Sequence, residues 1–126
     1  MIVGITGLGG IFFKCNDPDK LREWYHEKLG LSSDQYGRTF LWDDTDGSSV
    51  WAPFSKDTTY FSPSDKEFMI NFRVNDLVTY LEELRVKEVE IVGELTVEIY
   101  GKFAHILDLE GNKIELWEPT DSAMKN

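Results

Sequence analysis

A single glutamate near the end of the chain lies in an apolar, strand-like run, Lys113-Ile-Glu-Leu-Trp117. An acidic side chain in such a run is costly to bury unless it has a partner or a chemical task. His105, ten residues earlier, could enter the same face. There it could form a hydrogen-bonded pair with Glu115 or, together with water, help it to bind a metal ion weakly. Glu115 could therefore act as a general base or as an anchor for a ligand.

Two helices are expected to position these residues. The first opens at Asn16-Asp17-Pro18, where Asn or Asp can cap it and proline suits the first turn, and Gly30 ends it. The second opens at Asn75-Asp76 and carries an apolar stripe at helical spacing. The stripe consists of Leu77, Tyr80, Leu81 and Leu84.

Strands are expected before and after each helix, so the order strand, helix, three strands occurs twice. Residues 11–15 and 69–74 lead into the two helices, and an acidic turn ending in glycine recurs at Gly47 and Gly111. The sequence therefore predicts one domain made of two similar modules. Module 1 covers about 7–56, the linker about 57–66, module 2 about 67–118 and the tail 119–126.

The composition narrows the class of protein. The 126 residues are 41% hydrophobic, which is enough for one folded domain with a core. The net charge of −10 argues against nucleic acid as a partner, because phosphates require Lys and Arg. No apolar run is long enough for a membrane helix, and the single Cys15 fits a reducing cytoplasm. We therefore expect a cytoplasmic protein that binds neither nucleic acid nor membrane.

The pattern resembles the vicinal oxygen chelate superfamily, which includes glyoxalase, bleomycin-resistance proteins and extradiol dioxygenases. The resemblance rests on three motifs: Asn16-Asp17-Pro18 with Trp24-Tyr25 and Leu29-Gly30-Leu31, Phe72-Arg-Val-Asn-Asp-Leu77, and the closing Asp108-Leu-Glu-Gly-Asn-Lys-Ile-Glu-Leu116. It covers nearly the whole chain, although Leu109 replaces the proline of the family's closing motif. It implies an α+β fold in which two βαβββ modules form an incomplete barrel, with the site on the concave face of the sheet.

Strand alternation predicts which side chains face this concave surface, or cup. Glu115 is the candidate catalytic residue, and the remaining inward residues form an apolar wall with a few polar groups. That mixture is typical of a small-molecule pocket. The candidate ligand-binding residues are Phe12, Lys14, Trp51, Met69, Asn71, Arg73, Phe103, His105 and Trp117. The aromatic residues of the segment 54–61 could close the rim of the cup, or could equally belong to a protein interface.

Enzymes of the superfamily usually hold a divalent metal at four strand positions. By the resemblance, these positions here are Gly10, Trp51, Met69 and Glu115. Only Glu115 offers a suitable donor, because glycine has no side chain, indole only donates, and a thioether is too soft. A catalytic site normally needs about three protein ligands. We therefore expect no metal and no cofactor.

Three functions remain open. The first is binding of a small organic molecule, for example an aromatic or cationic one, in a metal-free cup. The second is a glyoxalase-like lyase or isomerase, in which Glu115 is the base and Arg73 or Lys14 steadies the oxyanion. This alternative expects an apolar cup to raise the pKa of Glu115. The third is a regulatory module with a vestigial cup. The resemblance also implies a homodimer, in which modules are sometimes exchanged.

Overall fold

The computed structural model of the chain describes residues 11–41 and 49–120. Within these ranges, the first helix is α1, which continues directly into a π-helical turn, η1. One strand, a second helix and three further strands follow. The elements are α1 (Pro18–Trp24), η1 (Tyr25–Leu29), β1 (Ile70–Arg73), α2 (Leu77–Val86), β2 (Ile91–Glu98), β3 (Gly101–Leu107) and β4 (Lys113–Pro119).

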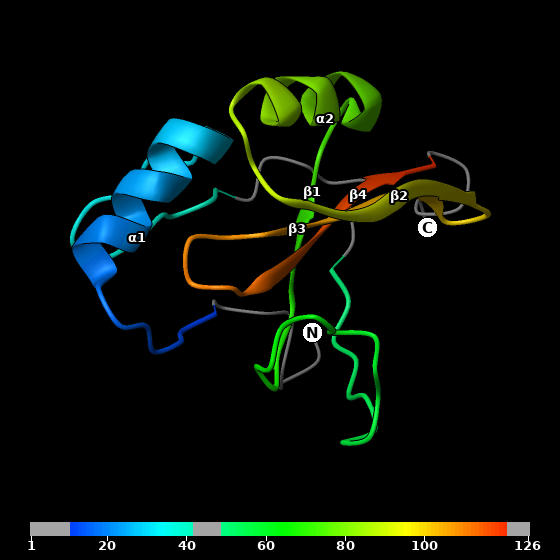
Figure 1. The fold of residues 1–126 in the computed structure, drawn as a ribbon, viewed down its shortest axis with the longest axis horizontal. Coiled ribbons are helices and arrows are strands. Elements are labelled where there is room, and N and C mark those ends of the chain that lie inside the picture. The colour runs from blue at the N-terminus through cyan, green and yellow to red at the C-terminus, as the bar shows by residue number, and fades with distance from the viewer. Residues whose placement is uncertain (1–10, 42–48, 121–126) are drawn as a thin grey trace, which may run out of the picture.

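The four strands form one mixed, open sheet in the order β1-β4-β3-β2 (Figure 1). β1 runs parallel to β4, whereas β3 is antiparallel to both of its neighbours. The parallel pair β1 and β4 requires a crossover connection, and here that connection consists of α2, β2 and β3. This is one complete βαβββ module, and the α+β fold class that the sequence predicts is confirmed.

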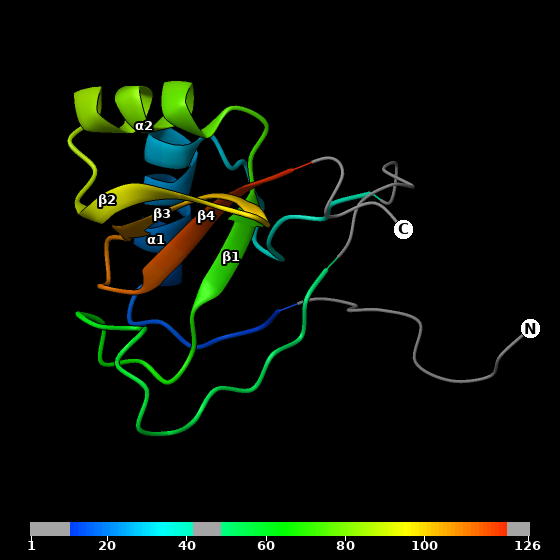
Figure 2. The ribbon, with the colours of Figure 1, turned by 90° about the vertical axis from the view of Figure 1, so that its right-hand side faces the viewer.

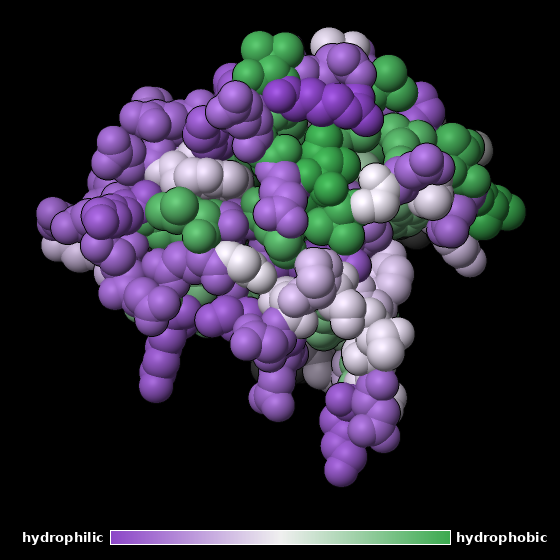
Figure 3. Space-filling view, viewed as in Figure 1, coloured by the Kyte–Doolittle hydropathy of each residue, from purple (hydrophilic) through white to green (hydrophobic). Residues whose placement is uncertain are grey.

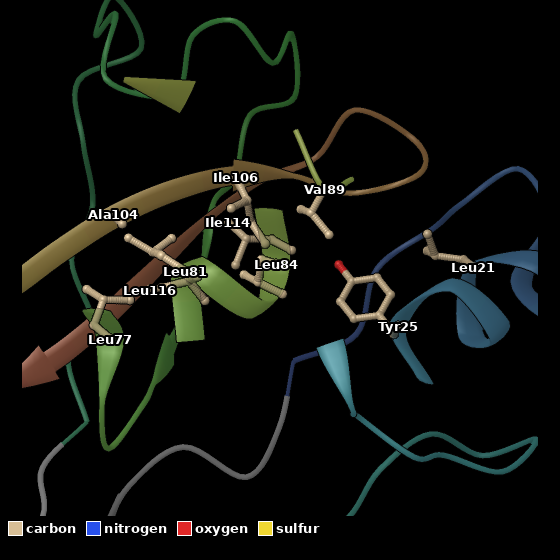
Figure 4. Close-up of a cluster of buried hydrophobic side chains, with 10 residues drawn as sticks. All are labelled: Leu21, Tyr25, Leu77, Leu81, Leu84, Val89, Ala104, Ile106, Ile114 and Leu116. Atoms are coloured by element: carbon tan, nitrogen blue, oxygen red, sulfur yellow. The ribbon is translucent and has the colours of Figure 1, made fainter. Parts of the chain in front are cut away.

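Helix α2 covers one face of the sheet, while residues 49–69 pass across the opposite side (Figures 1 and 2). The side chain of Asp76 caps α2 by accepting from the backbone N–H of Thr79. Three leucines of α2 point at the sheet and meet four of its side chains (Figure 4). These buried residues are Leu77, Leu81 and Leu84 from the helix, and Ala104, Ile106, Ile114 and Leu116 from the sheet.

The α1–η1 segment docks on the turn between β3 and β4. Asp17 caps α1, and the carboxylate of Glu110 accepts from the backbone N–H groups of Asn16 and Asp17 at 2.8 and 3.0 Å. Tyr25 is buried and donates its hydroxyl hydrogen bond to Asp108 at 2.7 Å. These hydrogen bonds fasten the first half of the chain to the closing motif of the second half.

The prediction of strands in the first half of the chain is wrong for the described residues. Residues 11–15, 38–41 and 49–52 form no strand, and Trp42 of the expected second strand lies outside the described residues. Phe13 contacts Phe68 at a ring-centroid distance of 5.6 Å, but residues 11–15 form no ladder with β1. An alternating pattern prepares a segment for pairing, yet a strand forms only where a neighbour supplies ladder hydrogen bonds.

The region 94–101 is mostly strand and includes the tip of the β2–β3 hairpin. β2 extends to Glu98, and two residues join it to β3. Gly101 begins β3 at φ 131°, where an added Cβ would lie 2.1 Å from the carbonyl oxygen of Glu118. Only glycine therefore fits this close approach between β3 and β4.

None of the helices within 11–41 and 49–120 is both long and apolar enough to span a membrane.

Candidate functional site

Two neighbouring rungs of the sheet present their side chains on the face opposite α2. In the polar rung, Asn71 of β1 pairs with Glu115 of β4, which pairs with His105 of β3. In the aromatic rung, Arg73 pairs with Trp117, which pairs with Phe103. The strands thus bring together six of the residues that alternation predicts for the cup.

The carboxylate of Glu115 is the centre of the polar rung. Glu115 is only 8% exposed. Oε1 accepts from the Asn71 amide at 2.8 Å, whereas Oε2 accepts from the hydroxyl of Tyr60 at 2.5 Å. His105 Nε2 lies 2.8 Å from Oε2 and donates to it, because an ionised carboxylate only accepts. A buried acid is thus held by three donors from three different parts of the chain.

These donors reverse the effect of burial on Glu115. Burial by itself raises the pKa of the carboxyl group, but the hydrogen bonds from His105, Tyr60 and Asn71 together lower that pKa below its ordinary value. The expectation of a raised pKa for Glu115 is therefore wrong. A carboxylate with a lowered pKa and occupied oxygens is a weak proton acceptor but a well-oriented, charged hydrogen-bond acceptor.

Tyr60 reaches the polar rung from residues 49–69, which contain no helix or strand. Its ring is stacked with Phe54 at 5.9 Å and meets His105 edge-on at 5.4 Å. The ammonium group of Lys113 lies 5.1 Å from the ring centroid and donates to the backbone oxygen of Tyr60 at 2.6 Å. Burial, followed by the hydrogen bond to Glu115, raises the pKa of Tyr60. The phenol therefore remains a donor.

The aromatic rung adds an apolar wall. Trp117 is buried and its ring is stacked with Phe103 at a centroid distance of 6.2 Å. The indole N–H of Trp117 donates to the backbone oxygen of Tyr100 at 2.9 Å, which fixes the plane of the ring. Nearby, hydrophobic residues gather on the surface at the tip of the β2–β3 hairpin (Figure 3). Val97 and Ile99 are 73% and 77% exposed there.

Other predicted cup residues lie elsewhere in the structure. Phe12 is 97% exposed and Trp51 is 78% exposed, so neither forms an apolar wall in this chain, because their segments form no strand beside β1. Lys14 is also exposed. For Phe12, Lys14 and Trp51 the correction has one cause, the missing strands of the first half. Met69, in contrast, is half-buried and directly precedes β1.

Two residues of the site were not identified individually from the sequence. Lys113 lies two positions before Glu115 and so shares its face of the strand. Strand alternation was therefore sufficient to predict its position. Tyr60 belongs to the segment 54–61, for which closing of the rim was one of two expectations. Its pairing with Glu115 joins residues 55 positions apart, and nothing in the local sequence specifies that distance.

The donor set does not fit a divalent metal. Among residues 11–41 and 49–120, no group of three His, Cys, Asp or Glu side chains is placed to hold one. Gly10, the first of the four positions implied by the resemblance, lies outside the described residues. At the other three, Met69 and Trp51 are poor ligands, and the oxygens of Glu115 already accept from protein donors.

The open mixed sheet with α2 on one face is consistent with the α+β fold of glyoxalase-like proteins. The model of the Glyoxalase/Bleomycin resistance protein/Dioxygenase superfamily matches residues 7–116. The chain belongs to this superfamily. Comparison with curated protein sequences gives no match.

Solved structures have the same fold. The crystal structure of TnmS3, an antibiotic binding protein from Streptomyces sp. CB03234, is similar with a TM-score of 0.52 and 21% identity. That match covers 83% of this chain and 88% of TnmS3. A protein from the mobile metagenome of V. Pseudocholerae matches with a TM-score of 0.60 and 15% identity, over 95% of this chain and 99% of the other.

Proposed function

We propose that this protein binds a small organic molecule on the inner face of the sheet, without a metal ion and without making or breaking a bond. The observation that supports this most directly is the environment of the Glu115 carboxylate. It is a buried, ionised acceptor beside the stacked pair Phe103–Trp117, so directed polarity and apolar surface adjoin. The similarity to TnmS3, an antibiotic binding protein, supports the same choice.

The lyase or isomerase alternative is less well supported. It needs Glu115 to take a proton from a substrate, but the lowered pKa and three protein donors work against proton uptake. If the cup were vestigial, the hydrogen bonds of the polar rung would serve only to stabilise the fold. Binding uses the rung as it is, because a preorganised charged acceptor recognises a donor on the ligand.

Tryptophan fluorescence tests the proposal. Titration with bleomycin and a panel of planar aromatic antibiotics should change the emission of Trp117, with or without EDTA. Trp117→Phe should remove the change, whereas Trp51→Phe, which alters an indole that is 78% exposed, should preserve it. Saturable binding that disappears with EDTA, or turnover that depends on added metal, would overturn the proposal.

We further infer a homodimer built from two-module chains with the boundaries given above, in a cytoplasmic setting. The support for the dimer is the exposed apolar surface of the first half, in which Phe12 and Leu41 are 97% and 81% exposed. Large exposed apolar surface is typical of protein interfaces. Light scattering coupled to gel filtration should give twice the chain mass. A monomer mass at micromolar concentration would contradict this inference.

A further inference from the structure

We propose that Tyr60 occupies, as a part of the chain itself, a subsite for a phenol, and that the ligand of this face carries a phenolic ring that displaces Tyr60. This inference rests on the proposed function and names the chemical class of its ligand. Its support comes from the contacts of the Tyr60 hydroxyl, from the contacts of the Tyr60 ring, and from the segment that carries this residue.

The polar end of the subsite selects a hydrogen-bond donor. Glu115 Oε2 accepts from the Tyr60 hydroxyl at 2.5 Å and from His105 at 2.8 Å, while Oε1 accepts from Asn71. A carboxylate has no proton to donate, so the group that replaces the Tyr60 hydroxyl must bring one. A carboxylate or phosphate on the ligand would meet like charge at this point.

The sides of the subsite select a flat ring. His105 meets the ring of Tyr60 edge-on, and the Lys113 ammonium lies 5.1 Å from its centroid. Both contacts come from strands of the sheet, so they remain when Tyr60 leaves. Two rings can pack edge to face and an aromatic face attracts a cation, whereas an aliphatic alcohol offers neither interaction. The combination of acceptor, neighbouring ring and cation therefore favours a phenol over an alcohol or an acid.

Tyr60 is attached in a way that allows its exchange. The residue is 42% exposed, and its stacking partner Phe54 is 50% exposed and belongs to the same segment. Residues 49–69 form no helix or strand, so no ladder of backbone hydrogen bonds binds the segment to the sheet. Withdrawal of Tyr60 breaks its side-chain contacts with the sheet and the hydrogen bond from Lys113. A ligand phenol restores most of these interactions.

The experiment removes the internal phenol and supplies an external one. Tyr60→Ala should bind p-cresol, which reproduces the tyrosine side chain, about tenfold or more tightly than the wild-type protein does, because a charge-assisted hydrogen bond is at stake. The variant should prefer p-cresol over 4-methylanisole, which has the same ring but no donor. NMR titration that follows the His105 ring signals measures both affinities. Tyr36→Ala, which truncates a tyrosine that is 88% exposed, is the matched control.

Equal binding of p-cresol and 4-methylanisole by Tyr60→Ala would overturn the subsite, as would no gain over the wild-type protein. If Tyr60→Ala fails to fold by circular dichroism, Tyr60→Phe replaces it. Tyr60→Phe keeps the ring but frees the acceptor, so p-cresol should displace the introduced phenyl ring more readily than it displaces Tyr60 of the wild-type protein. Unchanged affinity in Tyr60→Phe would also overturn the proposal.

The two proposals fail in different ways. If p-cresol binds Tyr60→Ala selectively but no compound of the antibiotic panel binds the wild-type protein, the subsite stands and the proposed function falls. If panel compounds without a phenol bind the wild-type protein as tightly as those with one, the proposed function stands and the phenol subsite falls.

Discussion

The hydroxyl of Tyr25 donates to the carboxylate of Asp108 at 2.7 Å, and both residues are buried. The bond joins η1 to the turn before β4 across 83 positions of sequence. Asp108 also accepts from the backbone and side chain of Asn112, so the same carboxylate shapes the turn and receives the first half of the chain. The turn at Asp108 is therefore a structural junction, distinct from the polar rung further along β4.

Loss of the hydroxyl at this junction should destabilise the protein. Tyr25→Phe leaves a buried carboxylate oxygen with one donor fewer, and we expect the free energy of unfolding to fall by about 1–3 kcal/mol. Urea denaturation followed by circular dichroism measures the change. Tyr36→Phe removes the hydroxyl of a tyrosine that is 88% exposed and should cost almost nothing. Equal effects of the two variants would show that the bond to Asp108 contributes no net stability.

The close approach of β3 and β4 depends on Gly101. Gly101→Ala should destabilise the chain by more than the roughly 1–3 kcal/mol of backbone strain alone, because the new Cβ would lie 2.1 Å from the oxygen of Glu118. Gly93→Ala is the matched control, since Gly93 also has a positive φ, 71°, but an added Cβ there meets nothing within 4 Å. Thermal unfolding of both variants separates clash from strain. Similar melting temperatures would refute the clash.

Stability should depend on pH through Glu115. Its folded-state pKa lies below the ordinary value of 4.5, so the folded protein holds this proton less tightly than the unfolded chain does. The resulting stabilisation is present above pH 4.5 and is lost as pH falls through the lower folded-state value. The difference in unfolding free energy between wild type and Glu115→Gln should thus shrink as the solution is acidified. A difference that grows below pH 4.5 would mean that the pKa is raised instead.

The core under α2 should show the usual cost of a cavity. Leu81 is 2% exposed and packs against the sheet, so Leu81→Ala should lower the free energy of unfolding by about 2–5 kcal/mol. Val78 lies on the same helix but is 52% exposed, and Val78→Ala should cost far less. Chemical denaturation of both variants provides the comparison. A loss below about 1 kcal/mol for Leu81→Ala would place α2 outside the core.

Sequence alone determined the elements whose signals are local. Asp17 and Asp76 indicate where the two helices begin, because each N-cap side chain bonds a backbone N–H only three residues later. Alternation placed Glu115, His105 and Asn71 on one face of the sheet, since side-chain direction has a period of two. The motifs around these positions were also enough to indicate the superfamily.

Tertiary structure alone decided what those positions do. The first-half segments have strand-like patterns but form no strands among the described residues, because pairing depends on a neighbour and not on the pattern. The pKa of Glu115 is lowered and not raised, because three donors outweigh its burial. One of these donors, Tyr60, comes from 55 positions away. A local pattern shows which way a side chain points, but its partners, and with them its charge and chemistry, are set by contacts that only folding brings together.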